Sequence, residues 1–195
     1  ENTLDKIIIE NKNINYNILN SALFQINFTL LYLQKHYGFI HNDLHTNNVM
    51  YKSTKRKFLY YKFNNLYFKI PTYGVIFKII DFGRCMFNFK GKFFLNDVFS
   101  EYGEAHGQYE YTIDNVKNYN KIKKNLNINY NFDMCRLITT IFDEIKQIDT
   151  IEQCNEYNEL NTFLTNCVLD KNGQNIYKES PDDFKLYINI SNNAH

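Results

Sequence analysis

The chain has 195 residues, of which 44% are apolar and 17% aromatic, enough to bury the core of one domain. A formal net charge of +1 argues against a broad nucleic-acid-binding surface. No apolar run reaches the length of a membrane span, no signal peptide is visible, and the four cysteines form no C-x-x-C pair. We therefore expect a cytoplasmic protein with reduced thiols and with no nucleic acid or membrane among its partners.

The first elements are expected before residue 40. Residues 1–16 are polar and rich in Asn around three isoleucines, which predicts a short helix or strand with a loop. From Ile18 to Leu33 apolar residues recur every three to four positions, the period of an amphipathic helix. Gly38 should end this helix, because glycine is common just after the last helical residue.

Strand patterns follow. The expected strands are residues 49–51, 58–63, 66–70 and 75–80. Asn64 and Asn65 suit the turn of a hairpin between the second and third strands. The stretch 71–74 contains Pro and Gly and interrupts the pattern before the last strand, which is apolar except for Lys78.

The second half of the chain has fewer signals. Residues 84–131 lack periodicity and predict a loop, with a small basic patch at 117–124 that we interpret as a solvated face. The remaining expectations are a helix over 132–145, a third helix over 151–169 that ends near Asn172-Gly173, and a frayed tail from Ser191 onward.

Two motifs stand at the ends of these elements. Between the first long helix and the first strand lies His41-Asn42-Asp43-Leu44-His45-Thr46-Asn47-Asn48. After the last strand comes Asp81-Phe82-Gly83. Together they read His-x-Asp-Leu-x-x-x-Asn followed by Asp-Phe-Gly. Read without reference to any family, Asp43 caps a turn, Asn48 lies in a loop, and Asp81 ends a strand by chance.

In that order, the two motifs resemble the catalytic loop and the metal-binding motif of the protein-kinase superfamily. The stretches 81–84, 103–109 and 132–137 are most similar to the serine/threonine kinases assigned by motif in giant DNA viruses. The resemblance covers about residues 18–145 and implies an α+β kinase C-lobe within a single domain, residues 1–195. This lobe is mostly helical, with a small antiparallel β-hairpin region that carries the catalytic and metal-binding loops. For a viral protein the location is the host cytoplasm or the virion.

The resemblance implies an ATP-dependent phosphotransferase that acts on a protein Ser/Thr hydroxyl, with ATP and Mg²⁺ as cofactors. Asp43 would orient the attacking hydroxyl and accept its proton. Asn48 and Asp81 would hold Mg²⁺, since carboxylate and amide oxygens suit this ion. Phe82 and Gly83 complete the cofactor-binding motif, and Gly83 lets the backbone turn after Asp81.

Two further features, Asp133 and the spacing of the two motifs, are interpreted through this resemblance. Asp133 stands where kinases place a buried Asp bonded to the backbone of the catalytic loop; an ordinary Asp at a helix start is the competing interpretation. Asp43 and Asp81 are 38 positions apart, about twice the usual kinase spacing, and an inserted hairpin at 53–74 explains the difference.

The chain also departs from the family pattern. Asn42 replaces the Arg that receives an activating phosphate, so we do not expect this form of control. His45 replaces a Lys and would act on the transferring phosphate as a hydrogen-bond donor or, when protonated, as a charge; a purely structural His45 is the alternative. No Ala-Pro-Glu follows 84–131, which puts the usual peptide-docking end of that segment in question.

The N-lobe of a kinase is missing from this sequence. No glycine-rich loop or Val-Ala-x-Lys strand occurs, and about 40 residues before the catalytic loop are too few for that lobe. Since the chain opens on Glu1, we expect it to be part of a longer protein. Two alternatives stay open, a small-molecule kinase of the aminoglycoside or choline type, which His45 favours, and a pseudokinase scaffold, which would not need Asp43, Asn48 and Asp81.

Overall fold

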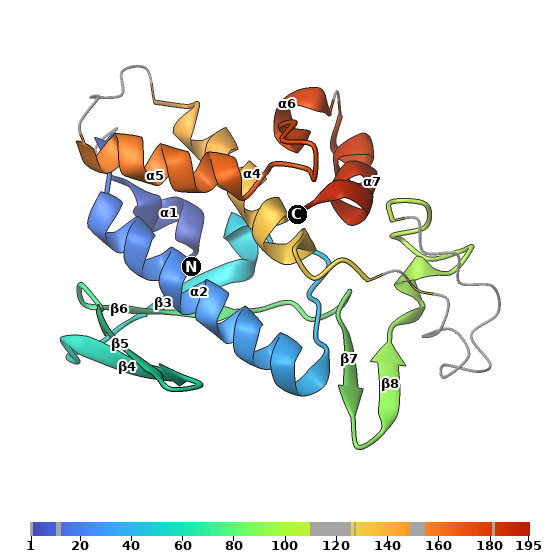
Figure 1. The fold of residues 1–195 in the computed structure, drawn as a ribbon, viewed down its shortest axis with the longest axis horizontal. Coiled ribbons are helices and arrows are strands. Elements are labelled where there is room, and N and C mark those ends of the chain that lie inside the picture. Colours follow the sequence, from blue (N-terminus) through green and yellow to red (C-terminus); the bar gives the residue numbers. More distant parts are fainter. Residues whose placement is uncertain (1, 11–12, 110–125, 127, 149–154, 181) are drawn as a thin grey trace.

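A computed structural model describes residues 2–10, 13–109, 126, 128–148, 155–180 and 182–195. The fold is mixed α/β, and its sheets in the described part are small, antiparallel and two-stranded. Most of the helices lie on one side of the molecule, and the longer strands lie on the other (Figure 1). No helix in the described ranges combines the length and the apolar character that crossing a membrane requires.

The N-terminal elements match the expectation. α1 (Leu4–Ile8) leads into a short pair of antiparallel strands, β1 (Ile9–Glu10) and β2 (Asn13–Ile14). α2 (Tyr16–Tyr37) begins at Asn15, whose side chain accepts the N–H of Ile18 at 3.1 Å. α2 ends at Gly38, which adopts the left-handed conformation, φ 54°, that terminates many helices.

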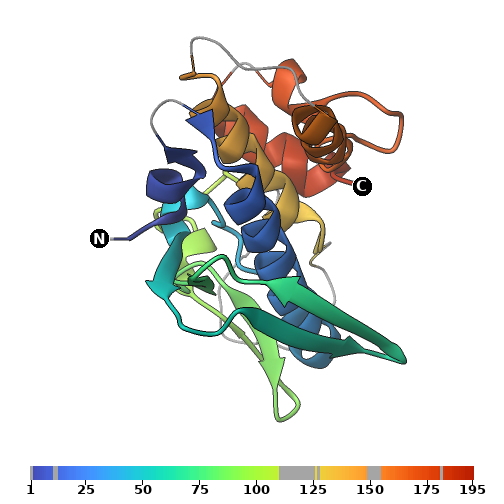
Figure 2. The same ribbon diagram turned by 90° about the vertical axis from the view of Figure 1, so that its left-hand side faces the viewer.

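The predicted hairpin within residues 53–74 is confirmed. β3 (Val49–Ser53) pairs antiparallel with β6 (Val75–Ile79), and the chain between them forms β4 (Phe58–Phe63) and β5 (Leu66–Pro71). The β4–β5 hairpin lies along α2 (Figure 2). Aromatic rings join the two elements, because Phe28 of α2 lies 4.6 Å from the Tyr61 ring and 6.2 Å from the Phe68 ring.

The prediction of a loop over residues 84–131 is wrong for residues 86–99. β7 (Met86–Phe89) and β8 (Lys92–Leu95) form a second hairpin, followed by a 3₁₀ turn, η2 (Asp97–Phe99). The two-residue turn has Lys90 at φ 49° and Gly91 at φ 75°, and positive φ at both positions is typical of a tight hairpin. The strands are short and half-exposed, so Lys90-Gly91 was the available signal. The basic stretch 117–124 lies outside the described residues.

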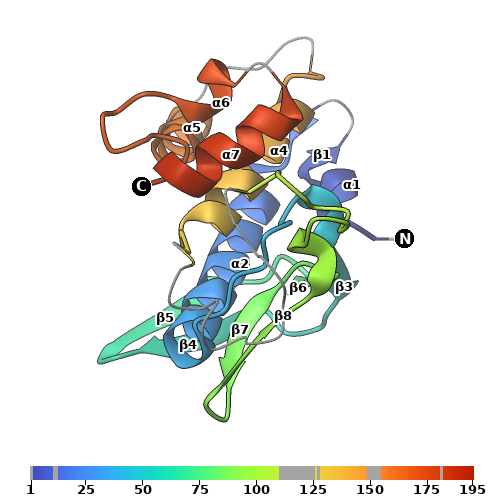
Figure 3. The same ribbon diagram turned by 90° about the vertical axis from the view of Figure 1, so that its right-hand side faces the viewer.

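The C-terminal helices extend beyond the prediction. α4 (Phe132–Ile145) has the expected bounds, and α5 (Asn155–Asn166) lies within the expected third helix. α6 (Ile176–Glu179) and α7 (Asp183–Asn193) were not expected. The prediction of a frayed tail from Ser191 is wrong, since Ser191 is buried and the Asn129 amide donates to the Ala194 carbonyl at 2.9 Å. α7 lies across α4 (Figure 3), and this packing orders the tail.

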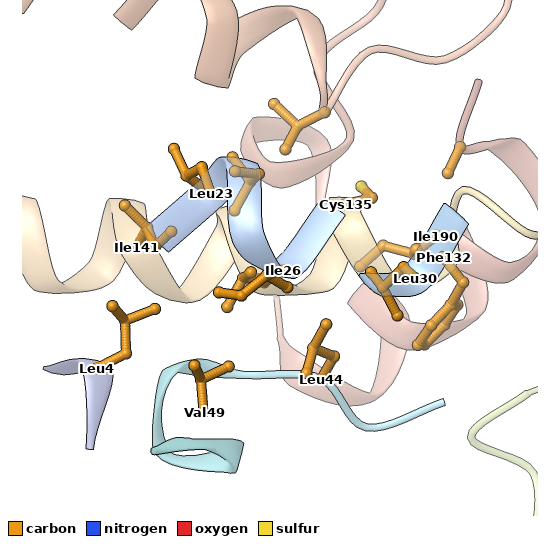
Figure 4. Packing of buried hydrophobic residues seen from close by; sticks show 14 of the residues in the cluster. Leu4, Leu23, Ile26, Leu30, Leu44, Val49, Phe132, Cys135, Ile141 and Ile190 are labelled. Atoms are coloured by element: carbon orange, nitrogen blue, oxygen red, sulfur yellow. The ribbon is translucent and has the colours of Figure 1, made fainter. Parts of the chain in front are cut away.

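The core is centred on α2 and α4. Leu23, Ile26 and Leu30 of α2 face α4 (Figure 4), and all three are buried. From α4, the buried Phe132, Cys135 and Ile141 meet them. Each such large apolar side chain contributes about 1.5–3 kcal/mol by leaving water. Leu44 and Val49 join the same core and are fully buried, so the segment between them is fixed at both ends.

The cysteines of the described part carry no disulfide. Cys85, Cys135 and Cys167 are free thiols, in agreement with the expectation of reduced cysteines, and Cys154 lies outside the described residues. Burial raises the pKa of Cys135 to about 12, so this thiol stays protonated and behaves as a small apolar core residue.

Candidate active site

The two sequence motifs meet at the end of one β-ladder. Residues 46–48 form a 3₁₀ turn, η1 (Thr46–Asn48), that leads directly into β3. The partner strand β6 ends at Ile79, and the N–H of Ile80 continues the ladder by donating to the Asn48 carbonyl at 2.9 Å. Asp81 therefore leaves the sheet beside Asn48, although the two residues are far apart in the chain.

His41 joins the two motifs through both nitrogens of its ring. The ring is buried, and Nδ1 accepts the N–H of Asp43 at 3.3 Å. In a neutral imidazole the other nitrogen then carries the proton. This nitrogen, Nε2, lies 2.9 Å from the Ile80 carbonyl oxygen and donates to it. His41 thus fixes the distance between the Asp43 segment and the start of the Asp81 turn.

Asp133 holds the backbone of the same segment from α4. Its carboxylate is fully buried and accepts the N–H of His41 at 2.8 Å and the N–H of Asn42 at 2.9 Å. The prediction that a buried Asp133 bonds to this backbone is confirmed. Burial raises the pKa of Asp133 to about 6, while His41 and the two backbone hydrogen bonds act in the opposite direction.

Asn42 is a structural residue at this position. It has a positive φ of 65°, a conformation that Asn adopts more readily than most side chains. Its side-chain amide donates to the Arg84 carbonyl at 2.9 Å, and its own carbonyl accepts the hydroxyl of Tyr109. Asn42 therefore ties the Asp43 segment to the chain just after the Asp-Phe-Gly motif and to residue 109.

The Asp43 carboxylate lies at the surface of this framework, with its side chain 18% exposed. Oδ1 accepts the hydroxyl of Tyr187 at 2.7 Å, and Oδ2 lies 3.6 Å from Nε of Arg84. The Asp43 carbonyl accepts the side-chain amide N–H of Asn48 at 2.8 Å. Since the amide nitrogen of Asn48 is committed to this bond, its oxygen is the end available to a cation.

His45 lies among the charged groups of the site. Burial lowers its pKa, and the nearby Arg136 and Arg84 act in the same direction, while the Asp43 and Asp81 carboxylates raise it. The net direction is downward, so the imidazole is neutral at neutral pH and offers one N–H donor. Both carboxylates of the predicted site are close enough to act on the same imidazole.

Asp81 and Phe82 form the exposed edge of the site. Asp81 has a positive φ of 61° and accepts the N–H of Gly83 on Oδ1 at 3.3 Å. Phe82 is 51% exposed, and its ring centroid lies 5.7 Å from that of His41. Asn48 thus bonds to the Asp43 carbonyl, the Asp43 and Asp81 carboxylates both act on the His45 imidazole, and Phe82 and Gly83 follow Asp81 directly in the chain.

An apolar pocket of about 400 Å³ adjoins this edge. Its lining consists of Leu33, Tyr37, Phe39, Phe82, Cys85, Phe87 and Phe89. These side chains come from the end of α2, from β7, from Phe82 of the second motif, and from Phe39 and Cys85 beside the two motifs. Phe82 therefore has one side against His41 and another on an open apolar surface.

Three contributors to the site were not predicted as site residues from the sequence, although Arg84 and Arg136 lie in stretches that the resemblance covers. Arg84 pairs with Asp43, donates to Gln108 at 2.8 Å, and lies 3.4 Å from the Glu104 carboxylate. Tyr187 reaches Asp43 from α7, and Arg136 of α4 lies over the Tyr187 ring at 4.8 Å. Tyr187 is 144 residues from Asp43 in the chain, and no local pattern reports such a contact.

Comparison with known proteins gives one viral relative and no family. No family model matches the sequence. A stretch of 85 residues, 42% of the chain, is 42% identical to uncharacterized protein 098R of Invertebrate iridescent virus 6 and covers 14% of that protein. Within the described ranges, no group of three or more His, Cys, Asp or Glu side chains is placed to hold a metal ion.

Proposed function

We propose that this chain is the C-lobe of an ATP-dependent protein kinase that transfers the γ-phosphate to a Ser or Thr hydroxyl. The observation that carries the proposal is that the chain segments of Asp43, Asn48 and Asp81 meet at one end of the β3–β6 ladder. Phosphoryl transfer depends on positioning and charge stabilisation, and these three residue types are the ones it uses. His41 bonds to the Asp43 N–H and the Ile80 carbonyl, and Asp133 accepts the N–H groups of His41 and Asn42, so the backbone on both sides of the site is held.

Asp43 is the proposed base. Its carboxylate is partly exposed and is fixed on one oxygen, so an acceptor hydroxyl can approach the other oxygen. A general base must lie within hydrogen-bond reach of the proton that it accepts. The neutral His45 imidazole beside it would donate its one N–H to an oxygen of the transferring phosphate.

Asn48 and Asp81 are the proposed Mg²⁺ ligands. Their side chains offer hard oxygen donors, and the amide nitrogen of Asn48 is already engaged with the Asp43 carbonyl. Mg²⁺ is commonly held by one or two protein carboxylates together with phosphate oxygens and water, so this small donor set fits the ion. When bound, Mg²⁺ would neutralise negative charge on the phosphate groups. The residues that clamp the nucleotide phosphates would lie on an N-lobe outside these 195 residues.

A radiolabelled phosphate-transfer assay tests the proposal. The full-length protein with its N-lobe should label a generic protein acceptor, and Asp81→Ala should abolish the labelling. Asp97→Ala, which changes an exposed Asp on η2, is the matched control and should leave it unchanged. We expect the 195-residue chain alone to bind Mg-ATP weakly and to transfer no phosphate. A full-length protein that labels neither protein nor small-molecule acceptors would favour a pseudokinase, and labelling of small molecules alone would favour the other kinase class.

A further inference from the structure

The C-terminal helix α7 carries a hydroxyl, that of Tyr187, that binds the proposed base Asp43. The Tyr187 hydroxyl donates to Asp43 Oδ1 at 2.7 Å, a normal length for an O–H···O⁻ bond. Burial raises the pKa of Tyr187, so the phenol keeps its proton and remains a donor at neutral pH. No other side chain in the described part of the chain makes a hydrogen bond this short to the Asp43 carboxylate.

The Tyr187 ring has little freedom to move. It packs edge-on against Tyr109 at 5.5 Å between centroids and lies 5.9 Å from the Phe132 ring. The Arg136 guanidinium lies over its face at 4.8 Å. These three neighbours come from two other parts of the chain, so tertiary packing against α7 sets the position of the hydroxyl.

α7 itself is fastened at its C-terminal end. The side chain of Asn129 donates to the carbonyls of Ile190 at 3.3 Å and Ala194 at 2.9 Å. Asn129 lies just before α4, and α4 itself carries Asp133, which fixes the backbone at His41 and Asn42. The backbone of the Asp43 segment and the Asp43 side chain are thus held by two packed helices.

Arg84 cannot replace Tyr187 in this role. Its Nε lies 3.6 Å from Asp43 Oδ2, beyond hydrogen-bond distance, and the same guanidinium is shared with Glu104 and Gln108. Asp43 Oδ2 therefore has a more distant partner, Arg84, than Oδ1, which is hydrogen-bonded to Tyr187. An incoming hydroxyl would meet the carboxylate on its less constrained oxygen.

We propose that Tyr187 is a positioning residue that holds Asp43 Oδ1, so that Oδ2 faces the acceptor hydroxyl. This inference rests on the proposed function, because it assigns Tyr187 a role in the same transfer. Misplacing a reacting group by about 1 Å can reduce a rate by about 10²-fold, so one fixed hydrogen bond can affect turnover without touching the nucleotide. The role would make α7 part of the active site.

Tyr187→Phe in the full-length protein is the test, because it removes the hydroxyl and keeps the ring packing. We expect kcat to fall about tenfold while KM for ATP stays the same, since Tyr187 touches the base and not the nucleotide site. The matched control is Tyr177→Phe on α6, which also removes a hydroxyl that donates to an Asp, Asp143. The control should retain wild-type kcat and KM at a similar melting temperature.

A crystal structure of each protein gives a second readout that does not depend on turnover. In Tyr187→Phe the Asp43 carboxylate should rotate away from its wild-type orientation, while His41 and Asn42 stay in place. An unrotated Asp43 carboxylate would overturn the proposal. An unchanged kcat would also overturn it, because the Tyr187 hydroxyl would then have no effect on turnover. A higher kcat would mean that this hydroxyl competes with the acceptor for Asp43, and would overturn the proposal as well. If the wild type transfers no phosphate, the proposed function fails, and the crystal structures still decide whether Tyr187 orients Asp43.

Discussion

The imidazole Nε2 of His41 donates a hydrogen bond of 2.9 Å to the carbonyl oxygen of Ile80, across 39 residues of chain. This bond connects the segment that carries Asp43 to the turn that carries Asp81. The other ring nitrogen accepts the N–H of Asp43, so a single buried side chain bonds to the backbone of both segments. The spacing of the two motif segments therefore depends on the His41 side chain.

His41→Leu should destabilise the protein by about 1–3 kcal/mol, because it leaves the Ile80 carbonyl and the Asp43 N–H without their partner. Urea unfolding at neutral pH measures the free energy of unfolding. The matched control is His36→Leu on the exposed face of α2, where a change within about 0.5 kcal/mol is expected. Equal losses in the two variants would contradict a structural role for the His41 bonds.

Asp133 should make stability depend on pH between about 4 and 6. Its pKa is raised from 3.8 to about 6, so the folded state holds the proton more tightly than the unfolded state does. The contribution is fully present below pH 3.8 and is lost as the pH rises through about 6. Relative to Asp133→Asn, which does not titrate, the wild type should gain on the order of 1 kcal/mol between pH 7 and pH 5.

Urea unfolding of both proteins at pH 7 and pH 5 checks this prediction. The comparison uses the difference between the two proteins, so the titration of all other groups cancels. A wild type that loses stability relative to Asp133→Asn on acidification would show that the folded-state pKa is lowered, and would contradict the assignment of burial as the dominant effect.

Gly38→Ala should cost more stability than Gly173→Ala. Both glycines have positive φ, 54° and 79°, so both substitutions carry a similar backbone strain of about 1 kcal/mol. A Cβ at Gly38 would lie 2.9 Å from Nδ2 of Asn88 and 3.1 Å from the Tyr130 hydroxyl, whereas a Cβ at Gly173 would meet nothing within 4 Å. Thermal unfolding should show the larger drop in melting temperature for Gly38→Ala, and equal drops would mean that the neighbours move aside freely.

Leu44→Ala should destabilise the protein by about 2–5 kcal/mol, because Leu44 is fully buried in the hydrophobic core. Leu31→Ala on the exposed face of α2 is the control, with an expected loss below about 1 kcal/mol. Chemical unfolding monitored by circular dichroism compares the two. A small loss at Leu44 would mean that the segment 41–48 is held by its polar bonds alone.

The sequence by itself determined the elements that depend on neighbouring residues. The 3.6-residue period located α2, the strand patterns around the Asn64-Asn65 turn located the β4–β5 hairpin, Gly38 marked a helix end, and the helix over 132–145 was predicted with its observed bounds. The order of the two motifs also singled out Asp43, Asn48 and Asp81. These signals are readable because helix, strand and turn preferences act over a few consecutive residues.

Only the tertiary structure decided which residues meet. The 92-residue contact of Asp133 with His41 was expected from a resemblance, whereas the 144-residue contact of Tyr187 with Asp43 had no signal at all. The ordered tail and the β7–β8 hairpin were missed for a related reason, since short elements are stabilised by packing more than by their own preferences. Long-range pairs form when buried faces come together, and a linear sequence does not record which faces those are.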